Sequence, residues 1–137
     1  MVVAPLSSSQ STSTGGYLQW DITHSARKQV SHSHSTWLTI LEPGDYFVYT
    51  RVTFSKDHPK LALASRVKMR KGETAEDKDV MKAYCSLSGD TSSPQMCTAT
   101  QQDVITLEKG NQLSVWVQDL SLVDYEEGAT TFGIYKL

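Results

Sequence analysis

Two histidines spaced two residues apart, His32 and His34, form the most metal-like pattern in this chain of 137 residues, and His24 lies nearby. In a β-strand, residues at this spacing point to the same side, as two ligands of one metal ion require. Serines surround the pair, and the next glutamate, Glu42, lies beyond an apolar segment at the wrong spacing to complete a ligand set. We therefore expect solvated loop histidines here, with no metal site.

Other catalytic chemistry has no better support. The counts of Ser, His and Asp alone would allow a catalytic triad, but the chain has no Gly-x-Ser-x-Gly elbow and no glycine-rich phosphate loop. The tryptophans could line a carbohydrate site, although tryptophan in the strands of a sandwich more commonly packs in the core or at an edge. We expect packing for Trp20, Trp37 and Trp116, no catalytic residues and no cofactor.

The cysteines and the charges restrict the class of protein. Cys85 and Cys97 flank a stretch rich in Ser, Gly and Pro, which suits either a disulfide in an oxidising compartment or two free thiols in a reducing one. The net charge of -2 offers no basic stripe for nucleic acid or anionic lipid. No apolar run approaches the roughly 20 residues that span a bilayer. The first residues lack the basic flank of a signal peptide, so we expect any targeting segment to lie outside this chain.

Short apolar and β-branched segments separated by turn residues predict an all-β sandwich or barrel. Residues 7–16 are almost all Ser, Thr, Gln and Gly, which predicts a mobile loop or tail. No segment has a convincing helical period; the best helix candidate, 75–81, is too short to be stable alone. The predicted strands are 36–41, 46–54, 61–69, 80–87, 98–107, 113–117 and 130–137.

The predicted strand 46–54 is apolar on both of its faces. One face begins with Tyr46 and Val48, and the other begins with Phe47 and Tyr49. A strand of this kind must be covered on both sides along part of its length. In a sandwich one face meets the opposing sheet, and a neighbouring subunit would cover the second.

Segments in order along the chain resemble the tumour necrosis factor ligand superfamily. One such motif would be weak evidence, but four in family order over most of the chain are specific. The resemblance implies an all-β fold, a two-sheet antiparallel jelly-roll sandwich of the tumour necrosis factor type. It makes residues 17–137 the homology domain and residues 1–16 a flexible segment with a remnant first strand. The segments are 17–20 (YLQW), 43–54 (PGDYFVYTRVTF), 107–115 (LEKGNQLSV), and 120–127 (LSLVDYEE) with 132–137 (FGIYKL).

The resemblance also implies a function. A homotrimeric cytokine ligand without catalytic activity would bind and cluster tumour necrosis factor receptor-type cell-surface receptors in the three grooves between subunits. It would lie outside the cell, as the ectodomain of a type II membrane precursor or as a secreted or shed protein. Phe132 and Ile134 would face the sandwich core, joined by Trp37. The residues implied at the trimer interface are Phe47, Tyr49, Arg51, Gln102, Val104, Tyr135 and Leu137.

Receptor contacts are implied in three charged segments. The acidic loop near the end of the chain borders the family's groove, and tyrosine is a common anchor of protein interfaces. Two further charged loops would supply the other side of the groove and steer the partner electrostatically. The residues are Asp124, Tyr125 and Glu127 in the acidic loop, Lys56, Asp57 and His58 in the second, and Lys71 and Glu73 in the third.

The chain departs from the family pattern in two places. Relatives commonly carry Tyr-Leu-Gly-Gly-x-Phe where residues 100–105 read TQQDVI, which removes an aromatic residue near the axis. Gln102, Thr131 and Arg51 would make the surroundings of the threefold axis of the trimer more polar than in other family members. Arg51 would need a carboxylate or solvent there. In many relatives a disulfide also joins the loop after the long strand 46–54 to the loop that contains the Cys85 equivalent. Because 55–60 has no cysteine, the comparison pairs Cys85 with Cys97.

Two other classes of function remain open at this stage. One is a jelly-roll recognition module, related to complement heads or carbohydrate-binding domains, without cytokine signalling. The other is a jelly-roll enzyme of the cupin type, which would need a glutamate closer to His32 and His34 than Glu42.

Overall fold

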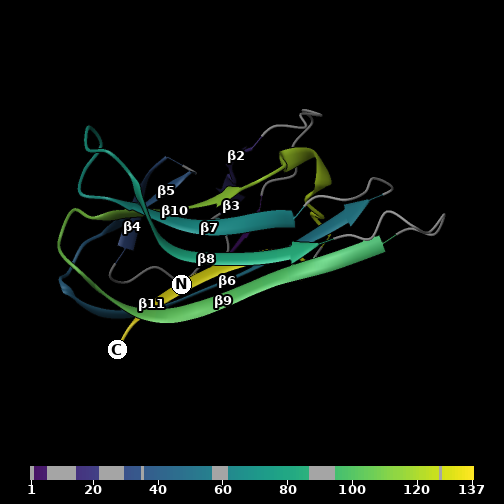
Figure 1. The fold of residues 1–137 in the computed structure, drawn as a ribbon. Coiled ribbons are helices and arrows are strands. Elements are labelled where there is room, and N and C mark those ends of the chain that lie inside the picture. Colours follow the sequence, from purple (N-terminus) through teal and green to yellow (C-terminus); the bar gives the residue numbers. More distant parts are fainter. Residues whose placement is uncertain are drawn as a thin grey trace.

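The described part of the chain is a sandwich of two antiparallel sheets. Figure 1 shows β6, β9 and β11 in one layer and β7, β8 and β10 in the other. One short 3-10 helix, η1 (Leu120–Leu122), follows β10. The computed structural model describes residues 2–5, 15–21, 30–34, 36–56, 62–86, 95–126 and 128–137.

The first sheet, called sheet I below, has the strand order β3-β1-β11-β6-β9. Its first and last strands in sequence are neighbours, because β1 pairs with β11. The long strands β6 and β9 pair over all 13 residues of each, which makes both longer than the predicted 46–54 and 98–107. The bounds are β1 Val2–Pro5, β3 Trp20–Asp21, β6 Gly44–Lys56, β9 Gln95–Leu107 and β11 Thr131–Lys136.

The second sheet, sheet II, has the order β4-β5-β10-β7-β8, with the short β2 (Gly16–Tyr17) also paired to β10. Strands distant in sequence again lie side by side, as a jelly roll requires. The predicted fold class, an all-β two-sheet antiparallel jelly roll, is confirmed. The remaining bounds are β4 Val30–His34, β5 Trp37–Ile40, β7 Ala62–Arg70, β8 Lys78–Ser86 and β10 Gln112–Val117.

Residues 75–81, the best but too short helix candidate, form no helix, and the predicted strand 80–87 is present as β8, paired with β7. One local prediction is wrong. His32 and His34 lie in β4, paired with β5, and not in a loop; the register shifts between them. The backbone of these histidines is described, whereas their side chains and His24 lie outside the described residues.

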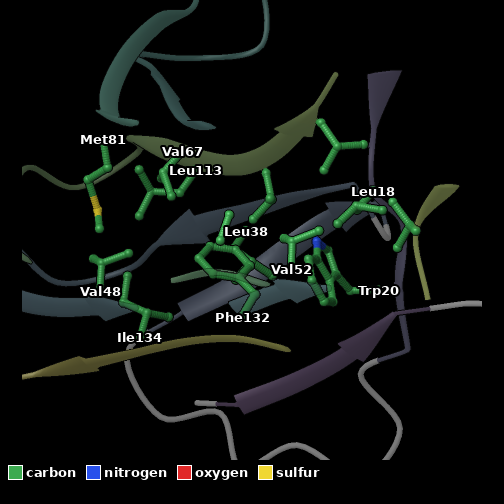
Figure 2. Close-up of a cluster of buried hydrophobic side chains, with 14 of the residues drawn as sticks. Leu18, Trp20, Leu38, Val48, Val52, Val67, Met81, Leu113, Phe132 and Ile134 are labelled. Carbon is green, nitrogen blue, oxygen red and sulfur yellow. The ribbon is translucent and has the colours of Figure 1, made fainter. Parts of the chain in front are cut away.

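The core lies between the sheets and consists of buried apolar side chains at the inward positions that the structure describes. Figure 2 shows Phe132 and Ile134 pointing from β11 toward Leu113 of β10. The rings of Trp20 and Phe132 are 5.5 Å apart. Burial of each large apolar side chain stabilises the fold by about 2 kcal/mol, so the face-to-face packing of these strands is the main source of its stability.

Trp37 does not join this core cluster, contrary to the prediction. Its neighbour Leu38 points inward, so Trp37 lies on the outer side of sheet II. There it packs against the Tyr17 ring at 5.2 Å and beneath the Arg70 guanidinium at 4.0 Å from the ring centre. A cation above the indole covers an apolar ring that no third layer of the described chain shields.

A disulfide joins the two sheets at one side of the sandwich. Cys85 of β8 and Cys97 of β9 are bonded, with Cα atoms 5.9 Å apart. Because β8 ends the strand order of sheet II and β9 ends that of sheet I, the bond connects two strands that share no backbone ladder. It therefore holds the layers together where hydrogen bonding between strands does not.

Replacement of both cysteines by serine should lower the free energy of unfolding by about 3 kcal/mol, as expected for a crosslink closing a loop of this length. The bonded residues are 12 positions apart in sequence. Denaturant unfolding of the wild type with and without reductant provides the matched control. The reduced wild type should unfold like the Cys85→Ser/Cys97→Ser variant, and the variant should not respond to reductant. Equal stability of the oxidised and reduced wild type would contradict a stabilising crosslink.

Candidate functional site

The outward face of sheet I carries exposed and half-exposed aromatic and aliphatic side chains. Alternation along β6 sends Tyr46 and Val48 into the core and turns Phe47 and Tyr49 outward. The strand register then lines up the neighbours of these residues on the same side. The set, called the aromatic face below, is Phe47, Tyr49, Arg51, Gln102, Val104, Tyr135 and Leu137.

Ring contacts organise the aromatic face. The Phe47 ring lies 5.2 Å from the Tyr135 ring and 5.9 Å from the Tyr49 ring, within the range of tilted aromatic pairs. A β-carbon at Gly133, which is opposite Tyr49, would overlap the tyrosine ring, so glycine here lets the ring lie flat on β11. Burial, reinforced by Tyr135, raises the pKa of the Tyr49 phenol.

Much of this surface is open to solvent. Val104 and Tyr135 are each 50% exposed and Leu137 is 67% exposed. Three large apolar side chains together on one sheet face form the type of patch that marks an interaction site in soluble proteins. The seven residues implied at a trimer interface therefore all lie on one face, although no second chain is present to test that role.

Arg51 is the cation of the aromatic face. Its Nη2 donates to the carbonyl oxygen of Gly128 at 2.5 Å. The expected partner was a carboxylate or solvent; the structure supplies a backbone carbonyl from the loop between β10 and β11. That bond links the aromatic face to the acidic loop at residues 124–130.

The segment that leads into the acidic loop, residues 119–123, is fixed by a capped 3-10 helix and by burial. The Asp119 carboxylate accepts from the Ser121 amide at 3.0 Å and from the Ser121 hydroxyl at 2.7 Å, which starts η1. Leu122 and Val123 are buried, and Tyr125 packs partly buried against the core. Burial raises the pKa of the Tyr125 phenol.

The residues implied in receptor contact fall at two opposite ends of the sandwich. Asp124 lies beside the end of β6, where its amide donates to the Thr53 carbonyl at 2.8 Å. Lys71 and Glu73 lie in the turn after β7, beyond Arg70, which pairs with the start of β10. Within one chain the structure does not bring these groups together. The backbone of Lys56 ends β6 near Asp124; the Lys56 side chain, Asp57, His58 and Glu127 lie outside the described residues.

A group of cations on the outer face of sheet II did not appear as a unit in the sequence. Arg66 and Lys68 lie over the Trp116 ring at 5.1 and 5.6 Å from its centre. The Asp79 carboxylate is 3.3 Å from Arg66, 3.2 Å from Lys68 and 3.8 Å from Lys82. Alternation of Arg66 and Lys68 predicts a shared face, but the pairing with Trp116 and Asp79 depends on strand register. The contacts stabilise a solvated sheet face.

Other kinds of site have little support within the described part of the chain. No three His, Cys, Asp or Glu side chains in this part of the chain are grouped to hold a metal ion. An open cavity of about 320 Å³ lies beside the turn after β7, lined by Met69, Lys71, Ala75, Glu76 and Lys78. Over the same described ranges, no helix has the length and apolar content to cross a membrane.

Comparison with known proteins gives consistent matches. The model of the TNF (Tumour Necrosis Factor) family matches residues 18–137. "Tumor necrosis factor ligand superfamily member 6" of Homo sapiens is 35% identical over 105 residues, covering 73% of this chain and 36% of the relative. "Tumor necrosis factor ligand superfamily member 15" of Rattus norvegicus is 32% identical over 118 residues, covering 74% and 45%. A crystal structure of murine APRIL superposes with a TM-score of 0.78 at 15% identity, covering 99% of this chain and 96% of that one.

The two-sheet jelly roll with its exposed aromatic face is a domain of the tumour necrosis factor type. The family model and the relatives above 30% identity establish family membership in addition to the fold. The chain belongs to the TNF (Tumour Necrosis Factor) family. It spans less than half the length of these relatives.

Proposed function

We propose that this chain is the receptor-binding domain of a trimeric cytokine ligand. The trimer binds tumour necrosis factor receptor-type cell-surface receptors in the grooves between its subunits and clusters them, with no catalytic step. The domain acts outside the cell, either as the ectodomain of a type II membrane precursor or in secreted or shed form. A disulfide between Cys85 and Cys97 suits that oxidising location.

The observation that carries the proposal is the aromatic face on a domain of this family. Covering a half-exposed side chain of the size of Tyr135 contributes about 1 kcal/mol. Leu137 and Val104 add to this, and a closed threefold assembly repeats every contact three times. The polar members of the face, Arg51 and Gln102, reduce the apolar area. We therefore propose a trimer whose stability depends on a few residues.

Receptor clustering follows from the symmetry of such a trimer. Three identical grooves hold three receptor chains at fixed separations, so binding is multivalent and each further contact forms at high effective concentration. Because Asp124 and Lys71 lie at opposite ends of the sandwich, a receptor that contacts both must run along the strands. A strand of 13 residues such as β6 is about 43 Å long. An elongated ectodomain fits that span better than a compact one.

Tyr49→Ala should weaken assembly, because it removes the ring that lies on Gly133 and packs against Phe47. We expect the dissociation to shift to at least tenfold higher protein concentration, measured by sedimentation velocity over a dilution series. Tyr84→Ala is the matched control, since Tyr84 is 58% exposed but lies on sheet II. Equal dissociation of the two variants would place the assembly interface elsewhere.

Asp124→Ala should leave the oligomer intact and reduce receptor affinity about tenfold or more, because a charged interface group is lost. Binding is measured by surface plasmon resonance against immobilised tumour necrosis factor receptor-type ectodomains. The Asp124 carboxylate also accepts from the Glu126 amide at 2.9 Å, so Asp124→Asn separates the loss of charge from the loss of that bond.

Glu108→Ala is the control for charge, since Glu108 is exposed in the turn between β9 and β10. It should bind like the wild type. If Asp124→Ala and Asp124→Asn both bind with wild-type affinity, the acidic loop is not the receptor contact. If the wild type binds no ectodomain of the panel, the cytokine proposal itself is contradicted.

A further inference from the structure

Thr53 is an outward-facing residue of sheet I that is nevertheless buried. Alternation along β6 puts it on the same side as Tyr49 and Arg51. Arg51 is exposed, whereas Thr53 is only 5% exposed. The end of the acidic loop at residues 129–130 contacts Thr53 and accounts for the difference.

The backbone of Thr53 takes the loop as a strand partner. Pairing of β11 with β6 stops at Thr131 opposite Arg51. Beyond this point the Asp124 amide donates to the Thr53 carbonyl at 2.8 Å, and an isolated bridge pairs Phe54 with Val123. The loop thus continues the sheet on the side that β11 leaves unpaired.

The side-chain hydroxyl of Thr53 holds the other leg of the loop. Its Oγ1 donates to the Ala129 carbonyl at 2.6 Å. A threonine has one hydroxyl proton, so the Thr98 hydroxyl, 3.1 Å away, is the donor in the contact between Thr53 and Thr98. The Thr53 amide donates to the Thr130 hydroxyl at 3.3 Å, and that hydroxyl donates to the Asp124 carbonyl at 2.8 Å. Both legs of the loop therefore connect to this one residue.

We propose that Thr53 is a positioning residue for receptor binding: it fixes the loop that presents Asp124 and Tyr125 to the receptor. This inference rests on the proposed function, because it concerns the same receptor contact. Arg51 extends the link to the aromatic face through its bond to the Gly128 carbonyl. A subunit that packs on Arg51 therefore also restrains the loop, and assembly helps to complete the receptor-binding surface.

The structure predicts which substitutions break the link. Valine matches threonine in shape but cannot donate to Ala129 or accept from Thr98, so Thr53→Val leaves the part-buried Ala129 carbonyl without this partner. Thr53→Ser keeps the hydroxyl and should restore the wild-type behaviour. Thr106→Val is the matched control. Thr106 is an outward-facing threonine at the other end of sheet I, and its hydroxyl donates to Asp45 at 2.6 Å, away from the loop.

Hydrogen–deuterium exchange on the intact chain tests the positioning role without any receptor. In Thr53→Val the amides of Asp124 and Ala129 should exchange about tenfold faster, the effect of losing one buried hydrogen bond. Core amides of β10 should be unchanged, which distinguishes loop release from general destabilisation. Thr53→Ser and Thr106→Val should match the wild type. Loop exchange in Thr53→Val no faster than in Thr106→Val would overturn the inference.

Receptor binding provides the second measurement. Against an ectodomain that binds the wild type, Thr53→Val should dissociate about tenfold faster while keeping the wild-type oligomeric mass. If the loop exchanges faster in Thr53→Val but the receptor dissociates at the wild-type rate, the positioning role is overturned and the proposed function stands. If no ectodomain binds the wild type, the proposed function fails, and the exchange data still decide whether Thr53 holds the loop. Should Thr53→Val not fold, Thr130→Val removes a second link, the hydroxyl that accepts from the Thr53 amide and donates to the Asp124 carbonyl.

Discussion

Strand β6 carries large apolar side chains on both of its faces, and each of these faces has to be covered. Tyr46, Val48 and Phe54 are covered by sheet II and form part of the core. Phe47 and Tyr49 point the other way, where the described chain provides only neighbours in the same sheet. The sandwich covers one face fully and leaves the second partly exposed. This imbalance is the physical basis for the proposed assembly.

Other features of sheet I accommodate the outward aromatic residues. Gly133 makes room for the Tyr49 ring, and Tyr135 continues the aromatic row onto β11. At the far end of β6 the apolar row gives way to Arg51 and Thr53, whose hydrogen bonds go to the acidic loop. One strand therefore supports an apolar surface suited to assembly and a polar anchor for a loop suited to recognition. Because the apolar surface and the loop anchor lie on the same strand, assembly and receptor binding would depend on each other.

The family resemblance implied the jelly roll. The alternation of residues predicted the longer strands, the two-faced character of β6 and an all-β sandwich or barrel. It failed where tertiary contacts outweigh local pattern. Pairing with β5 places His32 and His34 in strand β4 although serines surround them. The family resemblance implied a core position for Trp37, but its place next to inward-facing Leu38 turns it outward beneath Arg70.

The candidate site was predictable to different degrees. The aromatic face follows from a period of two along β6 and β11, combined with the family resemblance. Thr53 could not be found in this way, because its role depends on Ala129, which is 76 positions away in sequence. A threonine on an outward strand position is unremarkable until the loop is placed over it. The separation of Asp124 from Lys71 likewise could not be predicted, because it depends on which ends of the strands lie at the same end of the sandwich.

The molar mass of the chain in solution tests the central claim most directly, namely that the aromatic face is covered by other copies of the chain. Static light scattering at micromolar concentration should give about 46 kDa, three times the chain mass of 15.2 kDa. A mass of one chain at that concentration would contradict the account.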